Sequence, residues 1–357
     1  MKQPALGIVS TVLIMAVSLG VISLFDFPTF GSWVIFVMAS IIPMEIVIGV
    51  TWGANPGFVS SQPQPLKGIL LVLVNIAVGV IVGGICHRVV GGGIGPPIPI
   101  LVLFGIVSVV VTFWMAIMFG GWPFTSLIKN PVGAGLAMLA AVYIINYLLF
   151  RLFFDFTFMA GAPWYRANLD PHGMFNGVNA QVFYVTALTF LFVMLHFDLW
   201  PFTSSPAVMK QPVLGIVWTL LALVLGSVAY YIGVNTMGMD PMIFLTSGPI
   251  PFIFGTIVVL NMLHNSLFAK FTQPLKGVLN SMAALVIGVL LAKMYGALAP
   301  VVTGVLKPGP PTNDFEIWLA TALLGITFPF LIFFAEFFKM WPLQRAEQAK
   351  TVPAAHA

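Results

Sequence analysis

The sequence predicts an all-α integral membrane protein of about ten transmembrane helices, built from five parallel two-helix repeats. Three observations predict it: a composition poor in charge, a series of long apolar stretches, and short motifs that recur along the chain. The 357 residues are 60% hydrophobic and only 7% charged, whereas soluble domains carry roughly 25% charged residues. This composition excludes a soluble enzyme, a disordered chain and a nucleic-acid-binding module. The single cysteine, Cys86, excludes a disulfide framework and a thiolate metal cluster.

Apolar stretches long enough to cross a bilayer occur along the whole chain. The hydrocarbon core is roughly 30 Å thick, and a helix needs roughly 20 apolar residues to cross it. The stretches lie near residues 5–25, 31–52, 67–90, 98–119, 134–155, 178–199, 212–234, 248–269, 277–299 and 316–340. A β-barrel would instead show alternating segments of roughly ten residues. We therefore expect ten helices.

The first stretch has two features of a secretory signal, because Lys2 precedes an apolar run. However, its opening, MKQPALGIVST at residues 1–11, recurs as MKQPVLGIVWT at residues 209–219. A segment that recurs in mid-chain is more typical of a structural unit. We therefore expect the first helix to be retained.

Two further motifs indicate internal duplication. QPLKG occurs at residues 64–68 and 273–277, and WPFTS occurs at residues 122–126 and 200–204. Helices 7–10 therefore match helices 1–4. Within this duplication, the smallest repeating unit is a helix that begins at Gln-Pro, an outer loop, and a return helix that ends near Trp-Pro. Pro suits the first turn of a helix, and Trp suits the membrane interface. Five such units of two helices each share one orientation, so their axis lies along the membrane normal.

The basic residues predict the orientation. With the N-terminus in the cytoplasm, nine bases lie inside and five outside. The inner set is Lys2, Lys67, Lys129, Lys210, Lys270, Lys276, Lys339, Arg345 and Lys350; the outer set is Arg88, Arg151, Arg166, Lys293 and Lys307. We expect a protein of the bacterial inner membrane with both termini cytoplasmic. Its parts are membrane repeats at 1–155, an outside loop at 156–177, membrane repeats at 178–343, and a cytoplasmic tail at 344–357.

Four ionisable residues fall inside return helices, where such groups are costly and mark functional sites. They are Glu45, His196, His264 and Glu336. The two histidines occupy matching frames, VMLHFDLW at 193–200 and NMLHNSLF at 261–268, so we expect them at similar depth. If the four converge, two imidazoles can ligate a haem iron, hold a transition metal or relay protons. The alternative is that each group only forms a hydrogen bond or ion pair with a neighbouring group, with Asp198 and Lys339 as candidate partners.

The outside loop is the longest connection and the one with the most mixed chemistry. Its candidate contact residues for a ligand or partner are Trp164, Arg166, Asp170 and His172. The alternative is a polar linker between the two duplicated halves.

The favoured function is a permease or channel-like carrier of a small solute or ion, with the buried Glu and His groups near the cytoplasmic side. The alternative is a haem- or metal-binding redox or anchor subunit of a larger complex, with His196 and His264 as ligands; a purely structural subunit is a third interpretation. No nucleophile motif or nucleotide fingerprint appears. The sequence leaves open whether the protein is an enzyme. The expected partners are the lipid bilayer, the solute and other subunits, but not nucleic acid.

Overall fold

Ten helical segments within residues 1–344, the part that the computed structural model describes, are long and apolar enough to cross a membrane. About 69% of the protein is helical. In the described part, the strands are a single parallel pair of two residues each, β1 (Phe154–Asp155) and β2 (Phe175–Asn176). The prediction of an all-α protein with ten apolar spans is therefore confirmed. Of the predicted tail, residues 345–357 lie outside the described part.

The odd-numbered spans form an outer layer. Only 22–44% of the residues in their most apolar windows are buried, so most of their surface faces away from the protein. These outer helices are α1 (Ala5–Ile22), α4 (Leu66–Val89), α7 (Pro131–Phe153), α9 (Val213–Tyr230, continued by the π-helical η6, Tyr231–Thr236) and α12 (Leu275–Val302).

The even-numbered spans form an inner layer, in which 56–72% of the corresponding residues are buried. The first is α2 (Phe27–Thr29), η1 (Phe30–Val34), α3 (Ile35–Ile46) and η2 (Val47–Thr51). The next two are α5 (Pro99–Phe113) with η3 (Trp114–Met118), and α8 (Gly177–His196). The last two are α10 (Pro241–Ser247), α11 (Pro249–Ile257) and η7 (Val258–Met262), then α13 (Asp314–Ala320), η8 (Thr321–Thr327), α14 (Phe328–Ile332) and η9 (Phe333–Phe337).

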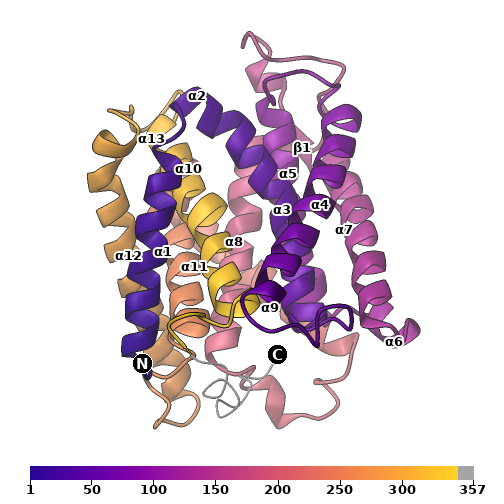
Figure 1. The fold of residues 1–357 in the computed structure, drawn as a ribbon. Helices are drawn as coiled ribbons and strands as arrows, with labels where there is room; N and C mark the ends of the chain where they lie inside the picture. The colour runs from indigo at the N-terminus through magenta and orange to yellow at the C-terminus, as the bar shows by residue number, and fades with distance from the viewer. Residues whose placement is uncertain (345–357) are drawn as a thin grey trace.

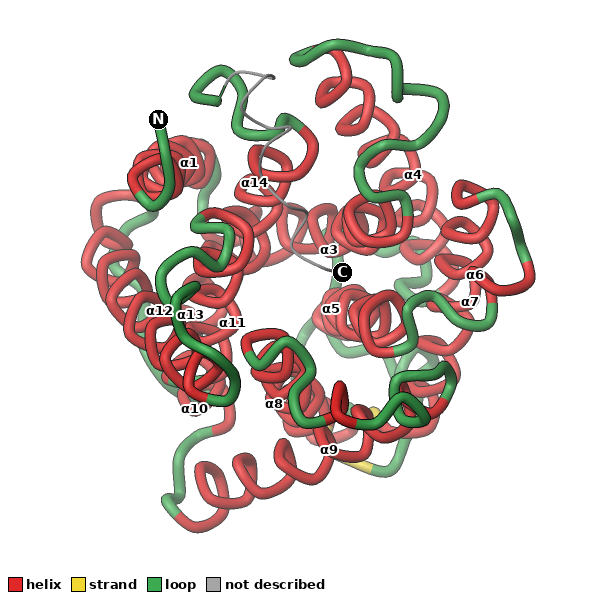
Figure 2. The backbone as a smooth tube through the Cα atoms, turned by 90° about the horizontal axis from the view of Figure 1, so that it is seen from below, coloured by secondary structure: helices red, strands yellow, loops and turns green. Residues whose placement is uncertain are grey.

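The inner helices close into a ring, seen end-on in Figure 2. Each contacts the next in chain order: α3 contacts α5, α5 contacts α8, α8 contacts α11, and α11 contacts α14. The ring closes because η8 of the last inner helix contacts α3 of the first. The outer helices pack around this ring, as α4 does on α3 and α12 on α11.

Successive spans run in opposite directions, so the connections gather at two ends of the molecule (Figure 1). We call the end that holds the starts of the outer helices the basic end; it carries Lys2, Lys67, Lys129, Lys210, Lys276 and Lys339. We call the opposite end, where residues 156–177 and the short η4 (Thr157–Met159) lie, the loop end. At the basic end, α6 (Phe124–Leu127) and η5 (Phe202–Ser204) occupy two of the connections.

The eighth span differs most from its expected limits. It runs from Pro241 to Met262 rather than near 248–269, and it breaks at Gly248 between α10 and α11. The side chain of Asp240 caps the start, because its Oδ1 accepts the N–H groups of Met242 and Ile243 at 2.9 and 3.2 Å. Pro249 follows the break, where it begins a new helix that needs no N–H.

Four glutamines bind outer helices to inner helices in the same way. The Nε2 of Gln3, Gln64, Gln211 and Gln273 donates to the backbone carbonyl of Met262, Phe337, Met118 and His196, respectively, at 2.7–3.1 Å. The Oε1 of each accepts the N–H of the glycine four residues later, which is Gly7, Gly68, Gly215 or Gly277. We call these contacts glutamine clamps. Each clamp occupies a carbonyl at the end of an inner helix, where no intrahelical partner remains.

We expect Gln64→Leu to destabilise the protein by about 1–3 kcal/mol, because it leaves the Phe337 carbonyl without its donor. The measurement is the free energy of unfolding of the full chain in detergent. Gln62→Leu is the matched control, since the side chain of Gln62 makes no hydrogen bond among the described residues. Equal stability of the two variants would contradict a structural role for the clamp.

Candidate functional site

A group of polar side chains lies at the basic end, where two inner helices finish side by side. The Nδ2 of Asn261, on η7, donates to Glu336 Oε1 on η9 at 3.3 Å. The Nζ of Lys339 donates to the other oxygen of Glu336 at 3.0 Å. With His264, these residues form what we call the mouth cluster: Asn261, His264, Glu336 and Lys339.

His264 follows η7 and lies beyond the apolar span that ends at Met262. Its backbone has φ +50°, the first of two left-handed residues that reverse the chain. Partial burial lowers the pKa of its imidazole; the charge of Glu336 opposes this and that of Lys339 reinforces it. The neutral imidazole is therefore favoured, and its Nδ1 has no hydrogen-bond partner among the described residues. The mouth cluster thus combines one carboxylate, one ammonium and two neutral polar groups, a set suited to a small polar or charged ligand.

His196 has different neighbours. It ends α8 and is fully buried, and its Nε2 lies 2.9 Å from the hydroxyl of Thr256 on α11. Its ring also packs edge-on against Phe252, with centroids 5.9 Å apart. The Nδ1 atom has no partner among the described residues. His196 therefore lies between two inner helices rather than reaching out to the membrane interface.

Glu45 lies on α3, two residues before η2 begins, and is 1% exposed. No hydrogen bond or ion pair within residues 1–344 joins it to the other three predicted residues. Of the four candidates, only His264 and Glu336 influence one another, through the charge of Glu336 on the His264 imidazole, and no hydrogen bond or ion pair joins them among the described residues. His196 and Glu45 have other neighbours in the inner layer.

Two members of the mouth cluster were not among the predicted site residues. The sequence suggested Lys339 only as a partner of one of the buried polar groups, and it does pair with Glu336. The available signal was their spacing of three residues, which on a helix places two side chains on one face. In the structure the helix ends at Phe337, and Lys339 follows it with φ +50°. Asn261 carries no such signal, because its contact with Glu336 joins residues 75 positions apart. Asp198, the other predicted neighbour, pairs with Lys276 at 2.7 Å.

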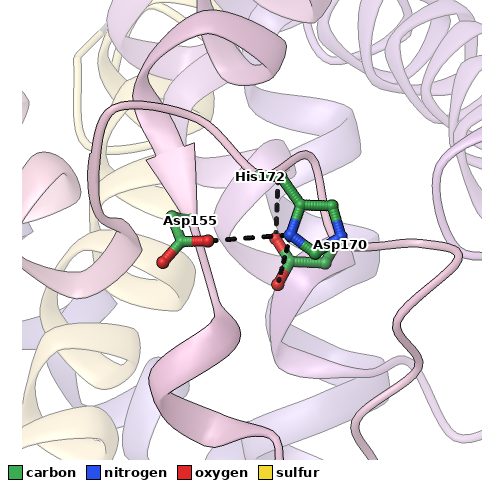
Figure 3. A group of neighbouring side chains, drawn as sticks. All are labelled: Asp155, Asp170 and His172. Atoms are coloured by element: carbon green, nitrogen blue, oxygen red, sulfur yellow. Dashed lines mark hydrogen bonds and ion pairs between the residues drawn. The ribbon is translucent and has the colours of Figure 1, made fainter.

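The outside loop is organised around Asp170 (Figure 3). The carboxylate of Asp170 is fully buried and accepts the N–H groups of Phe156 and His172 at 3.0–3.2 Å. It also accepts the hydroxyl of Tyr165 at 2.8 Å. The predicted contact residue Asp170 thus holds the loop together from its buried side, and both of its oxygens already accept hydrogen bonds.

His172 completes a group of three potential metal ligands with Asp155 and Asp170. Its Nδ1 lies 3.8 Å from Asp155 and 3.7 Å from Asp170. Main-chain and phenol donors already satisfy Asp170, and the hydroxyl of Thr157 donates to Asp155 at 2.6 Å. These hydrogen bonds indicate that the three side chains serve to hold the loop in its conformation.

Trp164 and Arg166 lie at the rim of the loop. With the segment 94–99 they line an open cavity of about 290 Å³. The guanidinium of Arg166 donates to the carbonyls of Pro163 and Tyr165 at 3.0 and 2.8 Å, which holds it over this cavity. Contact of these two residues with a ligand or partner stays a prediction.

We expect Asp170→Asn to lower the pKa of Tyr165 from about 12 toward its ordinary value of 10.0. The hydrogen bond to Asp170 raises this pKa most, because only the neutral phenol can donate it; burial and the charges of Asp170 and Asp155 act in the same direction. The folded-state pKa lies above the unfolded one, so this contact stabilises the loop fully below pH 10 and is lost as pH rises toward 12.

The measurement is the ultraviolet absorbance of tyrosinate against pH. Tyr165→Phe is the control, since it should remove the same late-titrating component. Superimposable titration curves for Asp170→Asn and the unaltered protein would refute the assignment.

Comparison of the chain with models of protein families, with curated proteins and with solved structures found no match.

Proposed function

We propose that the protein is a ring of five copies of one helical hairpin and that it moves a small solute or ion across the membrane. Each hairpin is an outer helix with the inner helix that follows it. The glutamine clamps support this arrangement, because each joins an outer helix to the inner helix two hairpins back around the ring: α1 to η7, α4 to η9, α9 to η3, and α12 to α8.

The remaining outer helix, α7, follows the same rule with a different residue. It begins at Asn130-Pro131 and packs against η2, where Gly135 meets the side chain of Trp52. Asn130 is one methylene shorter than Gln, and its Oδ1 caps its own helix by accepting the N–H of Val132 at 3.1 Å. The missing clamp is therefore consistent with a fifth copy whose glutamine has been replaced.

The ends of the inner helices also correspond. Each is followed by two consecutive residues with positive φ: Gly53 and Ala54, Gly120 and Gly121, Asp198 and Leu199, His264 and Asn265, and Lys339 and Met340. In four of the five, the last turn before this reversal is π-helical. Equivalent local structure at five positions supports duplication of one unit. In the same proposal the basic end faces the cytoplasm of a bacterial inner membrane, following the positive-inside rule.

The observation that carries the transport function is the mouth cluster. Ionisable groups in membrane proteins are retained where they line a path for ions or solutes. Asn261 and Glu336 occupy the same position in their hairpins, the residue before the carbonyl that accepts the clamp, and they meet at one end of the inner ring. The path would run along the ring axis, with Glu336 and His264 selecting the solute at the basic end.

The test is flux across vesicles that contain the purified protein. Stopped-flow light scattering would measure swelling in urea, glycerol, ammonium acetate and potassium chloride, against protein-free vesicles of the same lipid. We expect faster swelling with at least one of these probes. Equal rates with all of them would count against a channel-like carrier and favour a structural subunit.

The alternative, a haem- or metal-bearing redox or anchor subunit, requires His196 and His264 to act together. The Nε2 of His196 is engaged by Thr256, and the charged neighbours of His264 are Glu336 and Lys339. An absorption spectrum with metal analysis separates the two functions. A Soret band that disappears in both His196→Ala and His264→Ala would replace transport by the redox function.

A further inference from the structure

Glu45 is an acid enclosed in the apolar core with nothing to neutralise it. It is 1% exposed, and neither carboxylate oxygen has a hydrogen-bond partner among the described residues. An unpaired ionised carboxylate is strongly disfavoured in such surroundings, and the group takes up a proton or another cation instead.

Asn75 lies at the level of Glu45 on the neighbouring helix. The antiparallel helices α3 and α4 touch where a Cβ on Gly79 would meet the backbone of Ile41. Toward the basic end, Asn75 lies four residues before Gly79 on α4, and Glu45 lies four residues after Ile41 on α3. Because residues four apart share a helix face, both side chains lie at the contact between the helices. Asn75 is fully buried, and both its Nδ2 and Oδ1 lack partners among the described residues.

We propose that Glu45 and Asn75 form a proton-binding site within the membrane. A protonated carboxyl is the complement of an amide: its O–H donates to the amide oxygen, and its carbonyl accepts the amide N–H. The protonated acid and the amide therefore satisfy one another, whereas an ionised carboxylate offers no donor to the Asn75 oxygen.

The segments packed against α3 supply no counter-charge to Glu45. η1, η2, α5 and η8 contain no titratable residue. The titratable residues of α4 are Lys67, Cys86, His87 and Arg88. Lys67 lies eight residues from Asn75, or about 12 Å along the helix, and its amine donates to Asn55 at 2.6 Å. The other three lie eleven or more residues away toward the loop end.

The ligand set favours a proton over a metal cation. Hard cations such as Ca²⁺ and Mg²⁺ take about six or more oxygen ligands, and at this level Glu45 and Asn75 offer two side chains. The helix also changes from α to π two residues after Glu45, and single π turns are frequent at functional sites. If the proposed transport function holds, the proton is the coupling ion; proton binding itself does not require transport.

Infrared spectroscopy of the purified full chain in lipid tests the site. We expect the carbonyl band of a protonated acid at pH 7, lost in Glu45→Gln and shifted toward the frequency of a free acid in Asn75→Leu. Glu45→Gln should fold, because an amide has the shape of the protonated acid. Glu336→Gln is the spectral control and should keep the band, because Glu336 is paired with Lys339.

Two outcomes would overturn the proposal. In the first, Glu45→Gln loses only carboxylate bands, so that Glu45 is ionised in the native protein. In the second, the acid band disappears when sodium chloride replaces choline chloride at constant pH, so that Na⁺ occupies the site. Swelling assays keep the two proposals apart: an acid band without flux refutes transport alone, and flux without the acid band refutes the proton site alone.

Discussion

Replacing Gly288 by Ala is expected to destabilise the protein by about 3 kcal/mol, the largest stability effect we predict from a single methyl group. Gly288 on α12 and Gly255 on α11 lie where these two helices cross. A Cβ on Gly288 would overlap the backbone carbonyl of Pro251, and one on Gly255 would overlap that of Ala284. Backbone atoms cannot rotate away as a flexible side chain does, so the helices must separate.

Gly84→Ala is the matched control. Gly84 lies within α4, and a Cβ there would meet no atom within 4 Å. Alanine has the higher helix propensity, so this variant should be stabilised by up to about 1 kcal/mol. The two substitutions are chemically identical and are expected to have opposite signs. Unfolding free energies in detergent measure both, and destabilisation of both to the same extent would mean that the crossing of α11 and α12 is not decisive.

Glu336→Gln should lower solute flux about tenfold, which corresponds to roughly 1.4 kcal/mol. The variant keeps the size of the side chain but removes the charge that pairs with Lys339 at 3.0 Å. It also leaves Lys339 as an uncompensated charge at the mouth, which alters the electrostatic barrier there. The swelling rate of vesicles at matched protein content is the measurement.

Asp314→Asn provides the comparison for that variant. It makes the same acid-to-amide change in the same span, but at the loop end, where the Asp314 side chain makes no hydrogen bond among the described residues. We expect its flux to be unchanged. A similar loss in both variants would show that the effect comes from the net charge of the protein rather than from the mouth cluster.

Features that repeat along the chain were predictable from the sequence, because they depend on local chemistry. An apolar run of roughly 20 residues forms a helix in a membrane since only internal hydrogen bonds can satisfy its backbone there. Gln-Pro and Trp-Pro mark the ends of such runs for equally local reasons. The eighth span shows the limit of this approach: hydropathy alone does not register the cap at Asp240 or the break at Gly248.

The candidate site was predictable only in part. Glu336 and His264 were recognisable as ionisable groups near the ends of return helices, and in the structure the charge of Glu336 acts on the His264 imidazole. Lys339 lies three residues from Glu336, so their pairing had a signal in the sequence. Asn261 contacts Glu336 across 75 positions of the chain, and no sequence spacing encodes that contact.

The sequence match between His196 and His264 does not hold in the structure. The carbonyl of His196 accepts a glutamine clamp as that of Met262 does, whereas His264 corresponds to Asp198 as the first residue with positive φ. Thr256 is the residue that engages His196.

The sequence by itself determined the class of protein, the number of spans and the chemistry of their ends, because hydropathy and turn chemistry act over a few residues. The tertiary structure alone decided which helices form the inner ring and which polar groups meet. Those outcomes depend on close approaches between distant segments, such as Gly255 against Gly288 and Gln64 against Phe337. In a chain that is 60% hydrophobic, apolar character is too uniform to distinguish inner from outer helices, so small residues and buried hydrogen bonds select the packing.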